Sequence, residues 1–210
     1  MIKVLIADDH PVVREGLKKI FEKDPIIKVV AEANNGEELL KKISKNPCDV
    51  VLMDLSMPGR SWLDVIKEIK DLRANLPVLI VSMHKEEEYI VRALKSGASG
   101  YLTKDSLSDE LLTAVKKVVR GGRYVTAAIA EKLIDLLDDD KEQPLHKTLS
   151  DREYQVFTMI ARGKKTQEIA DELFLSTNTI STYRARILEK MNLKNTAEII
   201  HYALNHKLLD

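Results

Sequence analysis

Five short apolar runs recur in the first 120 residues, and amphipathic stretches with helical spacing separate them. The expected strands are 3–8, 28–33, 50–54, 78–82 and 100–104, which are rich in Val, Ile and Leu and lack polar alternation. Such runs are typical of strands buried on both faces of a parallel sheet. The expected helices are 12–23, 36–46, 62–72, 85–96 and 108–120. The sequence therefore predicts an α/β fold with a doubly wound, five-stranded parallel sheet.

Four of these runs end at a charged or nucleophilic side chain. Asp8 and Asp9 follow the first run, Asp54 ends the third, Ser82 ends the fourth and Lys104 ends the fifth. The carboxyl ends of parallel strands share one edge of the sheet, and ligands bind there. We therefore expect these side chains to converge on one small site.

The composition allows two domains and excludes several classes of protein. The chain has 210 residues, and its 33 basic and 33 acidic residues give a net charge of zero, which does not indicate a polyanionic partner. Its single cysteine, Cys48, has no partner for a disulfide, and no secretory leader pattern follows Met1. No apolar run approaches the ~18 residues of a membrane span. We expect a cytoplasmic protein without membrane insertion.

The second half of the chain changes character. Residues 121–145 read as a linker with a short helix at 127–137, followed by an acidic run that ends at Pro144. Residues 146–210 show helical patterns only, and residues 148–210 carry nine Lys or Arg residues against eight Asp or Glu residues. The expected organisation is therefore a sheet domain at 1–120, a linker and a small all-α domain.

Four helices are expected in that small domain. Ser150 and Glu153 have the spacing of a capping box that opens the first helix, and Asn195 caps the fourth, which runs to about His206. The second and third helices, at 166–173 and 178–191, are joined by a tight turn. Two short helices joined in this way indicate a helix-turn-helix unit.

The strand-end residues, in this order along the chain, resemble the receiver domain of two-component response regulators. The second half is similar to the LuxR-type DNA-binding domain, through Leu149-Ser-x-Arg-Glu, Gln167-Glu-Ile-Ala, Leu175-Ser176, Thr179-Ile180 and Lys190-Met191. Together the two halves resemble the NarL/FixJ family of response regulators over nearly the whole chain.

The resemblance implies that Asp54 is the phosphoacceptor. It also implies that Asp9 and Asp54 bind Mg²⁺ directly, that Asp8 helps through water, and that the backbone carbonyl of Ser56 completes the shell. The chemistry of the residues agrees, because crowded carboxylates need a cation among them and oxygen ligands suit Mg²⁺. An Asp carboxylate can also act as the nucleophile that forms an aspartyl phosphate.

Three further receiver residues have implied roles around the phosphoryl group. Lys104 is expected to pair with it, and Ser82 to donate a hydrogen bond to it. Tyr101 matches an aromatic that turns inward on phosphorylation in the family, although an aromatic near a sheet edge is also often plain packing.

Two residues near the site stand apart from this pattern. His10 follows the acidic pair and is interpreted as a surface histidine at a helix entry. Trp62 replaces a small residue that is common in the family, and it either alters the loop after Asp54 or is a partly exposed residue of a first helical turn.

The helix expected at 178–191 has two distinct faces. Its inward stripe consists of Ile180, Ile187, Leu188 and Met191. Its outward face, suited to base edges in a major groove, consists of Asn178, Ser181, Thr182, Ala185, Arg186 and Glu189. The residues that suit DNA phosphates are Ser176, Thr177, Arg184, Lys190 and Lys194.

The resemblance implies a docking mode on double-stranded DNA but not the base preference. Family members often carry Lys where this chain has Asn178 and Ser181, and His where it has Tyr183. The fourth helix pairs two copies on DNA in the family, so the active form is expected to be a homodimer.

The function indicated is that of a DNA-binding transcriptional regulator. A sensor histidine kinase would phosphorylate Asp54, and phosphorylation would control dimerisation and promoter binding. It would not be an enzyme beyond catalysing its own phosphorylation and dephosphorylation. One alternative is an aspartyl-phosphate hydrolase, which needs a second acid two residues after its nucleophile, where this chain has Ser56. Another is a phosphorylation-independent binder with a degenerate receiver, which the complete set of strand-end residues disfavours.

Overall fold

A computed structural model describes residues 1–85, 87–127, 129–131 and 144–209 of the chain. The chain divides into two compact units, Met1–Leu136 and Leu137–Asp210. Residues 127 and 129–131 of the expected linker helix are helical. The rest of that helix and most of the acidic run lie outside the described residues. Within the described ranges, no helix has the length and apolar character to cross a membrane.

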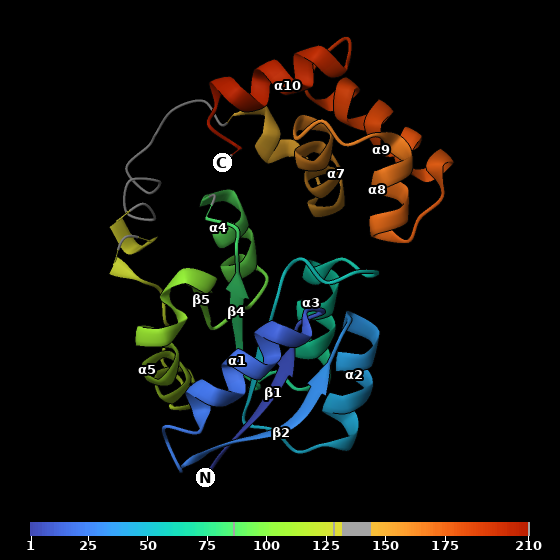
Figure 1. Cartoon of the computed structure of the whole chain (residues 1–210). Coiled ribbons are helices and arrows are strands. Elements are labelled where there is room, and N and C mark those ends of the chain that lie inside the picture. Colours follow the sequence, from blue (N-terminus) through green and yellow to red (C-terminus); the bar gives the residue numbers. More distant parts are fainter. Residues whose placement is uncertain (86, 128, 132–143, 210) are drawn as a thin grey trace. The chain divides into compact units, whose positions relative to one another are not determined.

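The first unit is a parallel sheet of five strands (Figure 1). The strands are β1 (Ile2–Ala7), β2 (Ile27–Ala33), β3 (Val50–Met53), β4 (Val78–Ser82) and β5 (Gly100–Thr103). Their order across the sheet is β2-β1-β3-β4-β5, and every pair is parallel. The predicted doubly wound α/β fold is confirmed.

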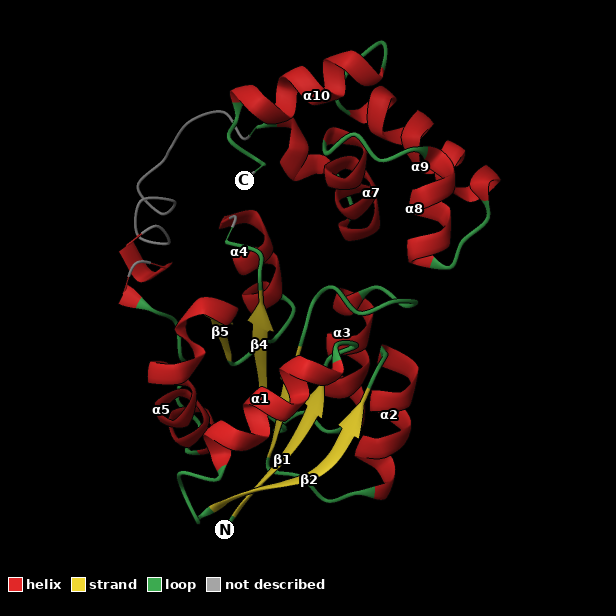
Figure 2. Cartoon of the chain, viewed as in Figure 1, coloured by secondary structure: helices red, strands yellow, loops and turns green. Residues whose placement is uncertain are grey.

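Helices cover both faces of the sheet (Figure 2). They are α1 (Pro11–Phe21), α2 (Gly36–Lys45), α3 (Trp62–Leu72), α4 (Glu87–Lys95) and α5 (Leu107–Val119). Helices α1 and α5 pack together on one face, where Leu17, Phe21, Leu111 and Val115 join the core. Helices α2 and α3 pack together as well.

Strand register determines which residues meet at the carboxyl edge. Ala7 of β1 pairs with Met53 of β3, so Asp8 and Asp54, the next residue of each chain segment, emerge side by side. The Asp54 backbone N–H donates to the Ala7 carbonyl at 2.9 Å and fixes this step. On the other side, Ser82 of β4 pairs with Thr103 of β5, immediately before Lys104.

The second unit is all-helical, as expected. After a short 3₁₀ turn, η2 (Leu145–Thr148), come α7 (Asp151–Ala161), α8 (Thr166–Leu173), α9 (Thr177–Lys190) and α10 (Thr196–Asn205). The predicted capping box is present, since Ser150 and Glu153 each accept a hydrogen bond from the other's backbone N–H. Phe174 ends α8 in the left-handed conformation, with φ of 54°, and so turns the chain into α9.

The packing of α2 on α3 gives the first prediction. A Cβ added at Gly36 would lie 2.6 Å from Cγ2 of the buried Val65, whereas one added at Gly16 in α1 would meet nothing within 4 Å. We expect Gly36→Ala to lower the free energy of unfolding by about 1–3 kcal/mol through overpacking. Gly16→Ala, the matched control, should raise it by up to about 1 kcal/mol through helix propensity. Chemical denaturation measures both, and destabilisation by the two variants alike would contradict the packing argument.

Candidate functional site

A single ammonium group joins two buried carboxylates at the carboxyl edge of the sheet. Lys104 Nζ donates to Asp8 Oδ2 at 2.8 Å and to Asp54 Oδ2 at 3.0 Å. Asp8 and Asp54 are each only 2% exposed. The convergence of these three residues from β1, β3 and β5 agrees with the sequence prediction.

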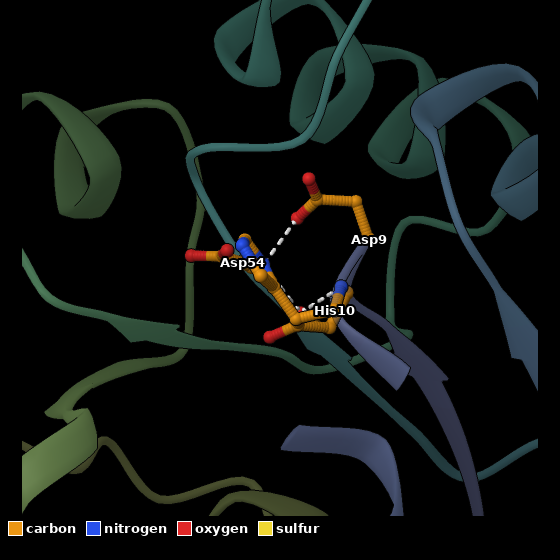
Figure 3. A group of neighbouring side chains, drawn as sticks. Asp9, His10 and Asp54 are labelled. Atoms are coloured by element: carbon orange, nitrogen blue, oxygen red, sulfur yellow. Dashed lines mark hydrogen bonds and ion pairs between the residues drawn. The ribbon is translucent and has the colours of Figure 1, made fainter. Parts of the chain in front are cut away.

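Two carboxylate oxygens at this edge of the sheet, from Asp9 and Asp54, have no hydrogen-bond donor in the described part of the chain. Among the described residues, Asp54 Oδ1 is buried and accepts no hydrogen bond. Asp9 Oδ1 lies 2.8 Å from His10 Nδ1 but without the alignment of a hydrogen bond. One ligand atom from each of Asp8, Asp9, His10 and Asp54 lies within 4.8 Å of the others (Figure 3). Buried carboxylate oxygens without donors fit a cation, so this cluster could hold a metal ion.

The electrostatics of the site follow from burial and charge. Burial raises the pKa of Asp54 above its usual value, and the nearby charge of Asp8 adds to this. The charge and hydrogen bond of Lys104, together with a backbone hydrogen bond from Ser56, oppose the shift without cancelling it. For Lys104, burial disfavours the ammonium, but its two carboxylate partners outweigh burial and raise its pKa. Ser56 itself lies exposed on the loop after β3.

Ser82 and Tyr101 both contact the backbone of His84, a residue that sequence reasoning did not single out. The Ser82 Oγ accepts a hydrogen bond from the His84 backbone N–H at 3.1 Å. The Tyr101 ring is fully buried, and its hydroxyl donates to the His84 carbonyl at 2.8 Å. Both side chains therefore contact the loop between β4 and α4.

Trp62 is buried, with 5% of its surface exposed, so the alternative of a partly exposed residue is wrong. Its ring centroid lies 6.2 Å from that of Tyr89. The Tyr89 ring in turn stacks on His84 at 4.4 Å. Trp62 is therefore a packing residue that connects the start of α3 with α4 and the His84 loop, a role that depends on contacts between separate helices.

His10 is exposed, as interpreted from the sequence, but its ring is not remote from the site. It precedes α1, and 61% of its side chain is exposed. Its backbone N–H donates to Asp8 Oδ1 at 2.8 Å, and its Nδ1 lies 3.4 Å from the same oxygen. Spacing alone could not show that the ring turns toward the carboxylates.

The two faces of α9 are largely as predicted. Ile180, Ile187 and Met191 are buried, whereas Leu188 is only half-buried. The exposed residues are Asn178, Ser181, Thr182, Ala185, Arg186 and Glu189. A polar, exposed helix that follows a tight turn has the dimensions and chemistry to enter a major groove.

The residues expected near DNA phosphates have varied surroundings. Ser176 is the N-cap of α9 and accepts from the Thr179 backbone N–H at 3.1 Å, and Thr177 is exposed beside it. Arg184 Nε donates to Thr196 Oγ1 at 3.1 Å, and Lys194 is exposed. Lys190 is different, because its Nζ lies 2.6 Å from Oε2 of the buried Glu153.

Glu153, the partner of Lys190, is 3% exposed and also forms the capping box of α7. Lys190 therefore ties α9 to α7 within the domain. No sequence signal links two residues 37 positions apart, so this role was missed.

Comparisons with known proteins decide the family. Residues 4–116 match the model of the response regulator receiver domain, and residues 147–203 match that of bacterial regulatory proteins of the luxR family. The response regulator UvrY of Escherichia coli is 37% identical over 209 residues, which cover 99% of this chain and 96% of UvrY. The oxygen regulatory protein NreC of Staphylococcus carnosus is 36% identical over the full length of both chains. The chain belongs to the NarL/FixJ family of response regulators.

Solved structures agree with this assignment. The RcsB response regulator of Salmonella typhimurium is 25% identical, with a TM-score of 0.72 over 96% of both chains. A complex of RcsB with DNA gives a TM-score of 0.61 at 26% identity, again over 96% of both. As a NarL/FixJ response regulator the chain is a DNA-binding regulator of transcription, and the hydrolase alternative is set aside.

The Glu153–Lys190 pair of this response regulator gives the second prediction. Burial would raise the pKa of Glu153, but Lys190 and Ser150 outweigh it and lower the pKa. The folded state therefore binds the Glu153 proton less tightly than the unfolded chain does. The resulting stabilisation is present above the unfolded pKa and disappears as the pH falls through the folded pKa.

We expect Lys190→Ala to lower the free energy of unfolding by about 1–2 kcal/mol at pH 7, since it leaves a buried carboxylate without its cation. Lys194→Ala, an exposed control on the following turn, should change it by less than about 0.5 kcal/mol. Thermal unfolding at pH 7 and below about pH 4 measures the difference between the two variants, which should shrink at the lower pH. An equal effect of the two variants at pH 7 would show that the pair does not stabilise the fold.

Proposed function

We propose that Asp54 is the phosphoacceptor of this response regulator, that a sensor histidine kinase phosphorylates it, and that phosphorylation controls dimerisation and promoter binding. One observation carries the proposal. Lys104 bridges the Oδ2 atoms of Asp8 and Asp54, while Asp54 Oδ1 is buried and accepts no hydrogen bond in the described structure. A carboxylate oxygen without donors keeps its lone pairs available for attack.

The residues around Asp54 suit transfer of a phosphoryl group from a phosphohistidine. Asp54 Oδ1 would form the new O–P bond while the N–P bond breaks and its electron pair leaves with the imidazole. The Lys104 ammonium, already within hydrogen-bond distance of Asp54, would neutralise charge on the transferring oxygens. Mg²⁺ held by Asp9 and Asp54, with Asp8 acting through water and the Ser56 carbonyl completing the shell, would supply further neutralisation.

The contacts at His84 supply a route from the phosphoryl group to the surface. Ser82 Oγ now accepts the His84 N–H. If the Ser82 side chain turns to donate to a phosphoryl oxygen, its Oγ moves away from the His84 N–H and this contact weakens. The Tyr101 hydroxyl is bonded to the carbonyl of the same residue, so its position would respond. We therefore assign Ser82 and Tyr101 as switch residues.

The DNA contacts are proposed on the exposed face of α9. Asn178, Ser181, Thr182 and Arg186 would reach base edges, with Ala185 against a thymine methyl. The residues that would contact phosphates are Ser176, Thr177, Arg184, Lys190 and Lys194. RcsB supports this mode, since it has been solved bound to DNA, bound to a promoter in the presence of phosphomimetic BeF₃⁻, and as dimers on DNA.

The remaining elements complete the proposal. Residues 121–145 would connect the receiver at 1–120 to the DNA-binding domain at 146–210, although Tyr124 still pairs with Gly100 at the edge of β5. The chain would act in the cytoplasm, where a histidine kinase and the chromosome are both accessible.

Replacement of the proposed phosphoacceptor is the first test. We expect Asp54→Asn to abolish labelling by a small phosphodonor with Mg²⁺, because an amide is a poor nucleophile. The same variant should raise stability without divalent ions by about 1 kcal/mol, or roughly 2–4 °C, because it removes charge repulsion at a buried site.

Asp64→Asn is the control, since Asp64 is exposed on α3. It should leave mass labelling and melting temperature unchanged. An acid-labile adduct that persists on Asp54→Asn, or labelling of the wild type in chelator, would overturn the site assignment.

The proposed base contact is tested on α9. We expect Arg186→Ala to weaken binding to the specific site by about 1–3 kcal/mol and to relax base preference. Lys194→Ala should weaken specific and random duplex about equally, because a phosphate contact carries no base information. Anisotropy titrations at fixed salt measure both. An equal loss on both duplexes for Arg186→Ala would show that this face does not read bases.

A further inference from the structure

The segment that follows α5 binds the outer edge of the receiver sheet. Strand β5 is the last strand in the sheet order, and α5 packs against it (Figure 1). Tyr124 forms a parallel bridge with Gly100 of this strand. The Tyr101 backbone N–H donates to the Tyr124 carbonyl at 2.9 Å, and the Tyr124 N–H donates to the Ser99 carbonyl at 3.0 Å. The start of the linker therefore satisfies backbone groups that an edge strand would otherwise expose.

Gly100 permits this close approach of two backbone segments. A Cβ added at Gly100 would lie 2.5 Å from the Tyr124 carbonyl oxygen and 2.9 Å from Leu79 Cδ1. Only a residue without a side chain leaves room for both neighbours. The contact between β5 and Tyr124 is therefore part of the packed domain.

The side chain of Tyr124 anchors the same segment to α5. Its hydroxyl donates to Glu110 Oε2 at 2.9 Å, and Lys117 Nζ lies 5.6 Å from the ring centroid. Burial, together with the Glu110 carboxylate, raises the pKa of Tyr124 to about 12, so the hydroxyl stays protonated and donates at neutral pH. A hydrogen bond to a carboxylate is among the stronger side-chain hydrogen bonds.

Tyr124 lies between the switch residue Tyr101 and the short helix of the linker. The Tyr101 hydroxyl donates to the His84 carbonyl, whereas its backbone N–H donates to Tyr124. Two residues after Tyr124, the Thr126 carbonyl accepts the backbone N–H of Ala130 at 2.9 Å and begins a helical turn. One residue therefore contacts β5, α5 and the start of the linker.

We propose that Tyr124 is a positioning residue of the switch, which fixes the backbone of Tyr101 and transmits its displacement to the linker helix that begins at Thr126. The inference rests on the proposed function for the role of Tyr101 and for the effect of phosphorylation on DNA binding. Loss of the Tyr124 anchor leaves the phosphorylation site itself unchanged, because none of its contacts involves Asp54 or Lys104. It weakens the effect of phosphorylation on the DNA-binding domain.

The test compares Tyr124→Phe with the wild type as full-length proteins. This variant removes only the hydroxyl that binds Glu110. The quantity measured is the ratio of the DNA dissociation constants before and after treatment with a phosphodonor and Mg²⁺. We expect this ratio to fall about twofold or more, the effect of substitutions within a coupled network. Phosphodonor labelling and the DNA affinity of the unphosphorylated protein should stay unchanged.

Two variants of α5 show whether the hydrogen bond itself is responsible. Glu110→Ala should lower the ratio as Tyr124→Phe does. The double variant should be no worse than either single variant, because both substitutions remove the same hydrogen bond. Asp109→Ala is the matched control, since Asp109 is exposed on the same helical turn and accepts from Ser108 Oγ instead. It should leave the ratio unchanged.

Amide hydrogen exchange gives a direct second readout at the bridge. Phosphorylation of the wild type should change the exchange rate of the Tyr124 N–H. An unchanged rate there, an unchanged ratio in Tyr124→Phe, an equal fall in Asp109→Ala, or reduced labelling of Tyr124→Phe would overturn the inference. Failure of the proposed function would appear separately, as phosphodonor labelling that survives Asp54→Asn or as a wild-type DNA affinity that phosphorylation does not change.

Discussion

The receiver site depends on the balance between buried carboxylates and the cation that lies among them. Asp8 and Asp54 are almost fully buried and adjacent. Ionisation of either carboxyl group would cost free energy without a compensating positive charge. Lys104 supplies one positive charge at 2.8 Å and 3.0 Å. No donor from the described part of the chain meets Asp54 Oδ1, so the site as folded favours a further cation and an incoming electrophile. The proposed nucleophile, metal ligands and phosphate contact all follow from this arrangement.

Much of this arrangement could be predicted from the sequence, because a parallel sheet places strand ends at one edge. The residues after β1, β3 and β5 had to converge once those strands were recognised, and register then brought Asp8 beside Asp54. The polar face of α9 was predictable for a similar reason, since helical spacing separates its exposed and buried residues. Periodicity carries this information because the backbone itself repeats.

Features that depend on contacts between separate elements were not predictable in this way. The burial of Trp62 depends on Tyr89 of another helix, and the use of Lys190 by Glu153 joins α9 to α7. The His10 ring lies against the carboxylates of Asp8 and Asp9, and these contacts have no sequence signature. In each case the residue type allowed more than one set of contacts, and only the tertiary structure shows which contacts the side chain makes.

The most direct measurement compares the DNA affinity of the full-length protein before and after phosphorylation. Residues 148–210 of the DNA-binding domain carry nine basic and eight acidic residues, so electrostatic attraction by one copy is weak. Affinity should then depend on two recognition helices that bind adjacent half-sites together. Anisotropy at one fixed salt concentration should show tighter binding after treatment with a phosphodonor and Mg²⁺. Equal affinity of the fully phosphorylated and unphosphorylated protein would contradict the account.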